Sequence, residues 1–439
     1  MNPTEQIIRL VQLLLRVPPA ARPGFARQHL LPAYVGVAQH FAALPPDQRA
    51  RTVLFVSMQP HFRETRIADA ARASGWNTLL LHHGPCRYDT ARHFSFAARV
   101  EDLSQLALAV WLFPGALAHV FALRGDHALL LCATKNRPMV VDLYDTCAGF
   151  LSATAGEKAA ERHALSFADG ITMRDLRVKY LERLHDYTLP AERVFIHDPP
   201  SDQNTSPEPL PREPDDPIRV VSVGWADGSE HSFLRISRAF CAAGIHVHLY
   251  LNPHQNINDP DVASYRELQR ENPCFHLEPP VYGADYSRKI RGYDFGLAIS
   301  ERFIFEEPST NYTPDYLAGC GSSRLTDFIQ LGLGVIVSPQ FRFQHYWARR
   351  YATTTVLATR ELLADPLPIL RAALAARRPL KIDSITVQGV SARLGRFYER
   401  VVHQAENLVP APALHSSHSA QTSSTACQAT MPEPRTLPL

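Results

Sequence analysis

Runs of apolar residues alternate with amphipathic segments along most of the chain, and this alternation predicts strands and helices in turn. Residues 52–57, TVLFVS, form a continuous apolar run typical of a strand that is buried on both faces of a parallel sheet. An amphipathic segment at 63–74 ends at Gly75, and a second strand is predicted at 77–81. The same reasoning predicts further strands in this half at 127–132, 139–142, 170–172 and 193–196, and helices at 103–110, 157–167 and 175–184.

The alternation stops at residues 198–217, which hold seven prolines and six acidic residues and cannot form a core. It then restarts, with strands predicted at 219–223, 245–251, 274–277, 295–299, 335–337 and 354–357, and helices at 232–243, 262–271, 287–291, 324–331 and 362–376. A chain that alternates in this way builds parallel sheets with helices on both faces and ligands at the carboxyl ends of the strands. We therefore predict an α/β protein with two doubly wound, Rossmann-like domains that face each other across a cleft.

Changes of composition divide the chain into six expected parts. Short helices broken by prolines are expected at 1–48, the first Rossmann-like domain at 49–197, and a proline-rich acidic linker at 198–217. The second Rossmann-like domain is expected at 218–384, followed by an amphipathic helix at 385–407 that packs back on the first domain. Residues 408–439 are rich in Ser, Thr, Pro and Ala, which predicts a disordered tail.

Composition and charge exclude several classes to which this protein could belong. At 439 residues the chain is longer than one core usually supports, and its formal charge of +2 argues against nucleic acid as a partner. Seven scattered cysteines without a CxxC pair indicate neither a disulfide framework nor a zinc site, and they favour a cytoplasmic location. The apolar run at 7–17 is interrupted by Arg9 and Arg16, so no signal peptide is expected. Its helical stripe could dock on the protein's own core or, alternatively, make a peripheral contact with the inner membrane face.

The segment at 322–338 carries the clearest candidate chemistry. Ser322 or Ser323 can cap a short helix, and Arg324 and Asp327 lie three residues apart on a face away from its apolar stripe. The free N–H groups and the dipole at the helix start would attract an anion, with Arg324 beside it. The carboxylate one turn further on could accept hydroxyl protons from a sugar. This arrangement suits a nucleoside diphosphate, and the alternative is an ordinary capped helix with a surface ion pair.

In their order and spacing, several segments resemble the GT-B glycosyltransferases. Within that fold the chain is most similar to the retaining, sugar-nucleotide-dependent group that includes many bacterial surface-polysaccharide transferases. The segments that carry the resemblance are HFRETRIADAARASGWNTLLL at 61–81, VVDLYDT at 140–146, ERHALSFADGITM at 161–173, RVVSVGWADGSEHSFLRISRAF at 219–240, YDFGLAIS at 293–300 and SSRLTDFIQLGLGVIVSP at 322–339.

The resemblance implies a glycosyltransferase that moves a sugar from a nucleotide-diphosphate donor to a hydroxyl of a glycan, lipid-linked or small-molecule acceptor. It implies that Arg324, Ser322 and Ser323 bind the diphosphate, that Asp327 holds the ribose hydroxyls, and that Gly224 lies at the inter-domain cleft. It also implies that no catalytic metal and no cofactor besides the sugar nucleotide is needed.

The sequence departs from the pattern of this group in three places, and one of them is the loop at 58–62, which lacks the paired glycines of many members. Residue 319, eight before Asp327, is a glycine where many members carry a glutamate, and the loop 224–231 holds no Arg or Lys. Stabilisation of the leaving group would then rest on Arg324, the helix start and His231. These departures keep open a non-catalytic GT-B protein that binds a nucleotide or glycan, or assists a partner transferase. A sugar-nucleotide epimerase with two similar domains is a third hypothesis.

Asp145 is the candidate in the first domain that could orient the acceptor or act as a base, because it lies just past the strand at 139–142. The alternative for Asp145 is a helix cap or a turn residue. The long loop at 300–321 could cover the donor or could be an ordinary solvated loop. Further polar candidates, each with a structural alternative, are Arg63, Glu64, Arg66, His82, His83, Glu306 and Glu307.

Overall fold

The computed structural model describes residues 32–408, except for 59, 61, 87, 102–105, 108, 111–112, 114, 116, 123–137, 144, 186–188, 197–215, 227–231, 253–254 and 282–283. The apolar stripe at 7–17, the strand predicted at 127–132, nearly all of the linker at 198–217, His231 and the tail after 408 therefore lie outside the described residues. The helix predicted at 103–110 is described only in part. Within the described part, no helix is both long and apolar enough to cross a membrane.

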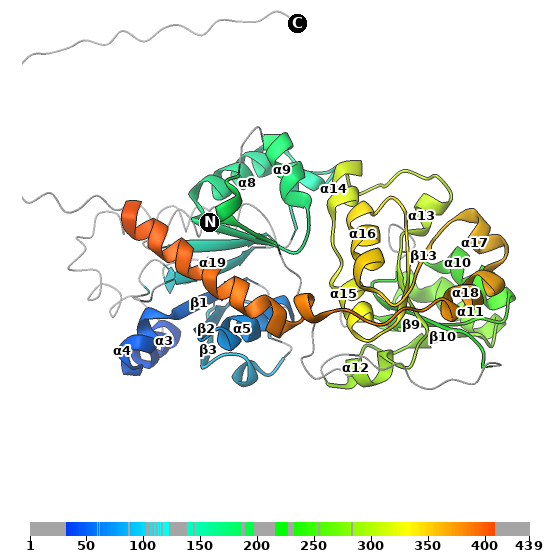
Figure 1. Ribbon diagram of the computed structural model, residues 1–439, viewed down its shortest axis with the longest axis horizontal. Coiled ribbons are helices and arrows are strands. Elements are labelled where there is room, and N and C mark those ends of the chain that lie inside the picture. Colours follow the sequence, from blue (N-terminus) through cyan, green and yellow to red (C-terminus); the bar gives the residue numbers. More distant parts are fainter. Residues whose placement is uncertain are drawn as a thin grey trace, which may run out of the picture.

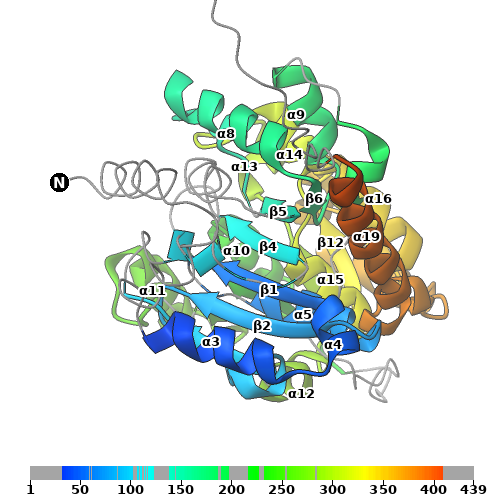
Figure 2. The same ribbon diagram turned by 90° about the vertical axis from the view of Figure 1, so that its left-hand side faces the viewer.

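The first half of the chain forms a parallel sheet of seven strands in the order β3-β2-β1-β4-β5-β6-β7 (Figures 1 and 2). The strands are β1 (Thr52–Ser57), β2 (Asn77–His82), β3 (Phe96–Arg99), β4 (Leu117–Ala122), β5 (Met139–Leu143), β6 (Gly170–Met173) and β7 (Val194–Ile196). The α-helices are α3 (Pro32–Ala43), α4 (Pro46–Ala50), α5 (Phe62–Ala73), α8 (Ala155–Phe167) and α9 (Arg177–His185). The strand order reverses at β1, which is where doubly wound sheets bind their ligands.

The central strand β1 is apolar throughout because helices cover both faces of this sheet. Leu54 and Val56 point to the face that is covered by α3, where they pack with Val37. Val53 and Phe55 point to the opposite face. A run without polar alternation is the expected sequence of a strand with two buried faces.

The second half forms a parallel sheet of six strands in the order β10-β9-β8-β11-β12-β13. The strands are β8 (Arg219–Gly224), β9 (His246–Leu251), β10 (Phe275–Glu278), β11 (Phe295–Ala298), β12 (Gly334–Val337) and β13 (Thr355–Leu357). The α-helices are α10 (Leu234–Ala242), α11 (Ala263–Glu271), α12 (Ala284–Ile290), α13 (Glu301–Ile304), α14 (Pro314–Gly319), α15 (Ser323–Gln330), α16 (Arg342–Tyr351), α17 (Arg360–Ala364) and α18 (Pro366–Ala375). The prediction of two doubly wound parallel sheets is therefore confirmed.

Helices cover both faces of the second sheet as well. Val220 packs with residues of α10, α11 and α18 in one core cluster. Its neighbour Val221 packs on the other face with Phe328 and Ile329 of α15. Phe328 lies so close to Gly296 of β11 that a Cβ at residue 296 would overlap its ring. This contact fixes how closely α15 lies on the sheet.

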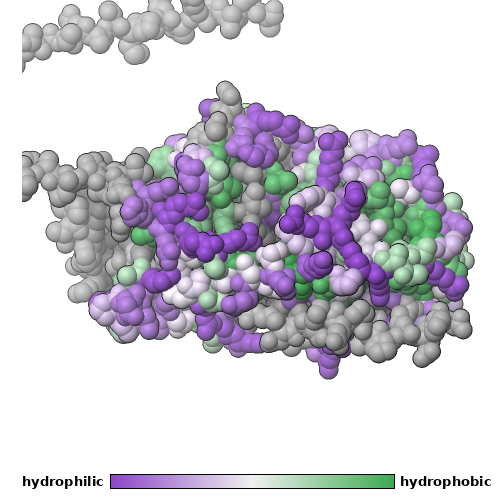
Figure 3. Space-filling view, in the orientation of Figure 1, coloured by the Kyte–Doolittle hydropathy of each residue, from purple (hydrophilic) through white to green (hydrophobic). Residues whose placement is uncertain are grey.

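The last helix, α19 (Val387–Leu408), crosses back from the second half of the chain to the first (Figure 1). Its residues Val390, Leu394, Phe397 and Val401 are buried in the same cluster as Val53 and Ile67 of the first domain. The opposite side of α19 is exposed, and Figure 3 shows a hydrophilic surface along this helix. The amphipathic helix α19, which follows the second sheet in the sequence, thus packs on one face of the first sheet.

The predicted elements differ from the observed ones in three ways. The strands β3 and β4 and the helix α16 were missed, although β4 lies beside β1 in the middle of the first sheet. The single helix predicted at 362–376 is two helices, because Pro366 starts a new one. The loop expected at 300–321 contains α13 and α14. Most other boundaries agree to within two residues.

We expect Leu394→Ala to lower the free energy of unfolding by about 2–5 kcal/mol, because Leu394 is fully buried between α19 and the first sheet. Urea denaturation followed by circular dichroism would measure the loss. Arg396→Ala is the matched control on the exposed side of the same helix and should change stability by less than about 0.5 kcal/mol. Equal effects of the two substitutions would show that α19 is not packed as described.

Candidate functional site

The start of α15 has the geometry that its sequence predicts. The Ser322 hydroxyl caps the helix by accepting a hydrogen bond from the backbone N–H of Leu325 at 3.4 Å. The helix ends before Gly332, whose φ of +78° lies in the left-handed region. Its apolar stripe is buried, so the helix start is held rigidly against the second sheet.

Arg324 lies directly over Gly224, the last residue of β8. A Cβ added to Gly224 would be 2.9 Å from Nη2 of Arg324, and the φ of Gly224 is +124°. Only glycine meets both conditions without strain. The structure therefore brings together two residues that lie a hundred positions apart in the sequence and that were both predicted at the site.

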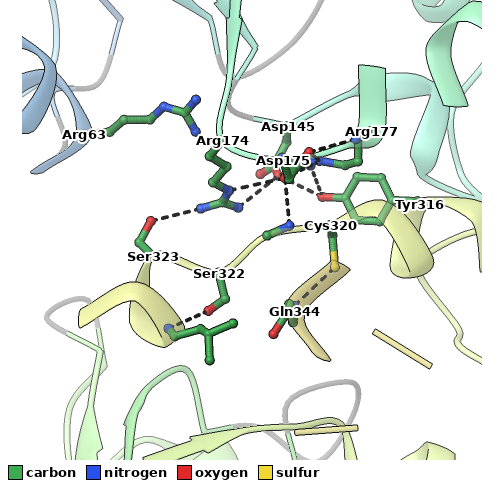
Figure 4. A network of polar contacts seen from close by, with 12 residues as sticks. Arg63, Asp145, Arg174, Asp175, Arg177, Tyr316, Cys320, Ser322, Ser323 and Gln344 are labelled. Carbon is green, nitrogen blue, oxygen red and sulfur yellow. Dashed lines mark hydrogen bonds and ion pairs between the residues drawn. The ribbon is translucent and has the colours of Figure 1, made fainter. Parts of the chain in front are cut away.

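A second arginine reaches the same helix from the first domain. Arg174 follows β6, and its Nη1 donates a hydrogen bond to the Ser323 hydroxyl at 3.2 Å (Figure 4). The same guanidinium lies 4.0 Å from Asp145 and 3.8 Å from Asp175. The N-terminus of α15 thus has one arginine from each domain beside it, which favours a bound anion.

Asp145 lies at the junction between the domains. Its Oδ1 accepts hydrogen bonds from Nη1 of Arg177 at 3.2 Å and from the hydroxyl of Tyr316 at 2.8 Å. Tyr316 belongs to α14 of the second domain, and its hydroxyl also accepts from Arg177 at 2.7 Å. The Asp145 side chain keeps 30% of its surface exposed, so it borders solvent as well as this network.

A fully buried pair of opposite charges supports Asp145 from behind. Asp175 and Arg177 are both 0% exposed, and the Arg177 Nε donates to both carboxylate oxygens of Asp175 at 2.9 Å. The backbone N–H of Gly321, in the second domain, donates to Oδ2 of Asp175 at 2.8 Å. Burial alone raises the pKa of Asp175, but Arg177, Arg174 and the Gly321 N–H outweigh it, so the net pKa is lowered.

Asp327 makes a contact across the interface between the domains. Its carboxylate accepts a hydrogen bond at 3.0 Å from Nη2 of Arg66, which belongs to α5 of the first domain. Both side chains are only 7% exposed, so this is a second buried charge contact across the domain interface. The Asp327 carboxylate therefore lies buried between the domains instead of on the protein surface. The role of Asp327 toward a ribose stays a prediction.

The other polar candidates of the first domain are turned toward that domain's interior. Glu64 accepts a hydrogen bond from the Ser57 hydroxyl at 2.6 Å, and Arg63 lies 3.0 Å from the buried Asp142. Burial raises the pKa of Asp142, although Arg63 and a hydrogen bond from Thr172 oppose this shift. The His82 ring is buried against the carbonyl of Gly84, and burial lowers its pKa.

Residues 300–321 make a structured contact with the first domain. Backbone hydrogen bonds join Leu151 to Asn311 and Thr313 to Gly149, each at 2.9 Å, around a β-bridge between residues 150 and 312. Glu307 is paired with Arg235 of α10 at 2.8 Å, and Glu306 lies 3.5 Å from Arg360. This segment therefore packs against the first domain and within the second, and it differs from the loop that was expected.

Sequence reasoning missed four residues of this junction, namely Arg174, Asp175, Arg177 and Tyr316. The signal that could have found the first three is the position of Arg-Asp-Leu-Arg directly after a buried strand, since strand ends of parallel sheets face the ligand. Tyr316 gave no such signal, because the contact that holds it comes from the other domain.

Metal-ligating side chains of the described residues gather in one place, at His246, His248 and His276. All three lie on β9 and β10, and none of them is among the residues described above as contacting α15. The group could not be recognised from the sequence, because its third member, His276, joins the other two only through the strand register.

No protein-family model matches the sequence, and no curated protein matches it. The fold is similar to that of HepE from Anabaena, solved with UDP-glucose, with a TM-score of 0.54 at 12% identity over 81% of this chain and 100% of that chain. HepE solved with UDP and glucose gives a TM-score of 0.54 at 12% identity, over 81% of this chain and 99% of that one. The apo form of the lipopolysaccharide outer core galactosyltransferase WaaB gives a TM-score of 0.46 at 12% identity, over 81% and 98% of the two chains. At such identities the HepE matches establish a shared fold, the GT-B architecture of two parallel-sheet α/β domains.

We expect Asp175→Asn to destabilise the protein by about 3–5 kcal/mol at neutral pH, because it removes the fully buried anion of Arg177 and leaves only the partly exposed Asp145. The pKa of Asp175 is lowered in the folded protein, so its contribution is present above about pH 4 and is lost as the pH falls. The difference between wild type and variant should therefore shrink when urea denaturation is repeated from pH 6 down to about pH 3.

Asp315→Asn is the matched control for this substitution. Asp315 makes an exposed contact of 3.3 Å with Arg183, which also joins the two domains. Its loss should cost no more than about 1 kcal/mol. A cost for Asp175→Asn as small as that of Asp315→Asn would contradict the described role of the buried pair.

Proposed function

We propose that the protein is a glycosyltransferase that binds a nucleoside-diphosphate sugar between its two domains and transfers the sugar to an acceptor hydroxyl. The observation that carries the proposal is the meeting of Arg324, Arg174 and the N-terminus of α15 beside Gly224. An anion of two phosphates at this point would contact both domains at once. The HepE structures support a sugar nucleotide as donor, with UDP as the first nucleotide to test.

The chemistry follows from where negative charge would develop. When the glycosidic bond breaks, the leaving diphosphate gains negative charge, and preorganised cations and N–H groups stabilise that charge. Arg324 and the helix start would supply this stabilisation from the second domain, and Arg174 from the first. No divalent ion is needed for this step, and no cofactor besides the sugar nucleotide is proposed.

The acceptor would bind on the side of the first domain, next to Asp145. The described contacts of Asp145 all involve its Oδ1, which leaves Oδ2 for the hydroxyl of an acceptor. Oδ1 already accepts two hydrogen bonds, which makes Asp145 a weaker base. We therefore assign Asp145 the role of orienting the acceptor in preference to that of a general base. A glycan or a lipid-linked acceptor is the class that we propose, with retention of configuration as the outcome to test.

We expect Arg324→Ala to lower the transfer rate by a factor of about 10² to 10³ while the fold is kept, because one stabilising contact to the leaving phosphate is removed. The measurement is release of nucleoside diphosphate from a panel of sugar nucleotides with glycan acceptors. Arg288→Ala is the control, since Arg288 is an exposed arginine of α12 in the same domain. Near-normal turnover of Arg324→Ala would remove Arg324 from the mechanism.

A second candidate function is non-catalytic binding of a nucleotide or glycan. The observation that favours it is the use of Asp327, the residue expected to hold the ribose, in a buried contact with Arg66. A protein of this kind would bind nucleotide without turnover and would assist a partner transferase. It is distinguished by saturable binding of UDP together with the absence of transfer or hydrolysis for every donor in the panel.

Two substitutions separate a ribose contact of Asp327 from a purely structural one. If Asp327 holds the ribose, Asp327→Asn should weaken nucleotide binding by roughly 1.5–3 kcal/mol, the range for a hydrogen bond to a charged group. Arg66→Gln removes the other partner of the same pair, but it should leave the affinity unchanged or improve it. Calorimetric titration with UDP, GDP and TDP measures both. Equal weakening by the two variants would show that the pair acts only by holding the domains together.

A further inference from the structure

Three histidines form a compact group on the edge strand β10 of the second sheet and on its neighbour β9. His246 and His248 are two residues apart on β9 and therefore point to the same face. His276 of β10 is the register partner of His248, so it points to that face as well. One ligand atom of each ring lies within 4.8 Å of the others.

The contacts within the group show that the rings already meet through their nitrogens. Nδ1 of His246 lies 3.0 Å from Nε2 of His276, and the rings of His248 and His276 are stacked with centroids 4.1 Å apart. At 3.0 Å one of these two nitrogens must act as an acceptor, so at least one ring is neutral. Neutral imidazole nitrogen is the form that binds metal ions.

A carboxylate holds one of the rings in the orientation that metal ligands need. Oε1 of Glu278, two residues after His276 on β10, lies 3.1 Å from Nδ1 of His248. This contact leaves Nε2 of His248 for an ion. A metal-ligating histidine commonly uses its second nitrogen for such a carboxylate, which fixes the ring and makes it a better ligand. The Tyr293 ring packs edge-on against His248 at 4.9 Å and closes one side of the group.

We propose that His246, His248 and His276 bind a divalent transition-metal ion of the Zn²⁺ class, with Glu278 as the supporting carboxylate. Three imidazoles suit Zn²⁺, and they leave a fourth position for water. Two ligands of a tetrahedral zinc ion lie about 3.3 Å apart when the bonds are about 2.0–2.1 Å, so small side-chain rotations would close the group around the ion. Arg219, the register partner of His246, places a cation beside the group, and Glu278 supplies the opposite charge.

The bound ion would join the edge strand β10 to its neighbour β9. An ion that binds only the folded state stabilises it by mass action. We therefore expect the midpoint of thermal unfolding to rise with the concentration of ZnCl₂.

The test is calorimetric titration of the full chain with ZnCl₂, after any histidine tag has been removed and metal has been stripped with a chelator. Wild type should bind one equivalent at this site. His276→Gln should weaken that binding by more than about 100-fold, since loss of a supporting residue alone costs about 10–100-fold. Glu278→Gln should fall in that lower range, and His163→Gln, an exposed histidine of α8, should match wild type.

X-ray absorption of the zinc-loaded wild type keeps the proposal testable if a variant fails to fold. It should show three imidazoles at about 2.0–2.1 Å. Absence of saturable zinc binding, unchanged binding by His276→Gln, or fewer than three imidazoles in the spectrum would overturn the proposal. Arg324→Ala should bind zinc as wild type does, so this test is independent of the proposed transfer reaction.

Discussion

One buried charge, the guanidinium of Arg177, determines how the two domains meet. It is fully enclosed, and it is held by Asp175 while it donates hydrogen bonds to Asp145 and to Tyr316 of the other domain. A buried cation without an anion would cost several kcal/mol, so these partners have little freedom to separate. The junction at which the candidate site lies is therefore fixed by a charge pair, Arg177 and Asp175, that is itself fully buried.

This constraint explains why glycines occupy the segment between α14 and α15. A Cβ at Gly321 would lie 3.0 Å from the Cβ of Asp175, and one at Gly319 would lie 3.3 Å from the backbone nitrogen of Arg177. Residue 319 is where many members of the transferase group that the sequence resembles carry a glutamate. Here the backbone of the first domain lies so close that a larger side chain would have to displace it. The departure from the pattern thus has a physical cause in the tight contact between the domains.

The sequence predicted the parts of the fold that depend on local patterns. The apolar runs of β1 and β8 and the capped helix at Ser322 were found because strand burial and helix capping are local properties. The central strand β4 was missed, although its six residues include Leu117, Val120 and Phe121. Within the same strand Ala118 is small and His119 is polar. The hydrogen bonds of the buried His119 ring come from distant residues, Tyr398 of α19 at 2.6 Å and Thr172 at 3.0 Å.

The second-domain half of the candidate site was the more predictable one, since Asp145 was the main candidate predicted from the first domain that lies at the junction. Arg324 and Gly224 follow from a helix start and a strand end, whereas Arg174 and Arg66 become relevant only when the domains face each other. Both arginines contact α15, one at its start and one a turn later. Opening the junction would break these contacts and the hydrogen bond from Gly321 to Asp175 together. Because so many polar groups are already in place, α15 presents a preorganised surface, and a ligand that binds there need not order it first.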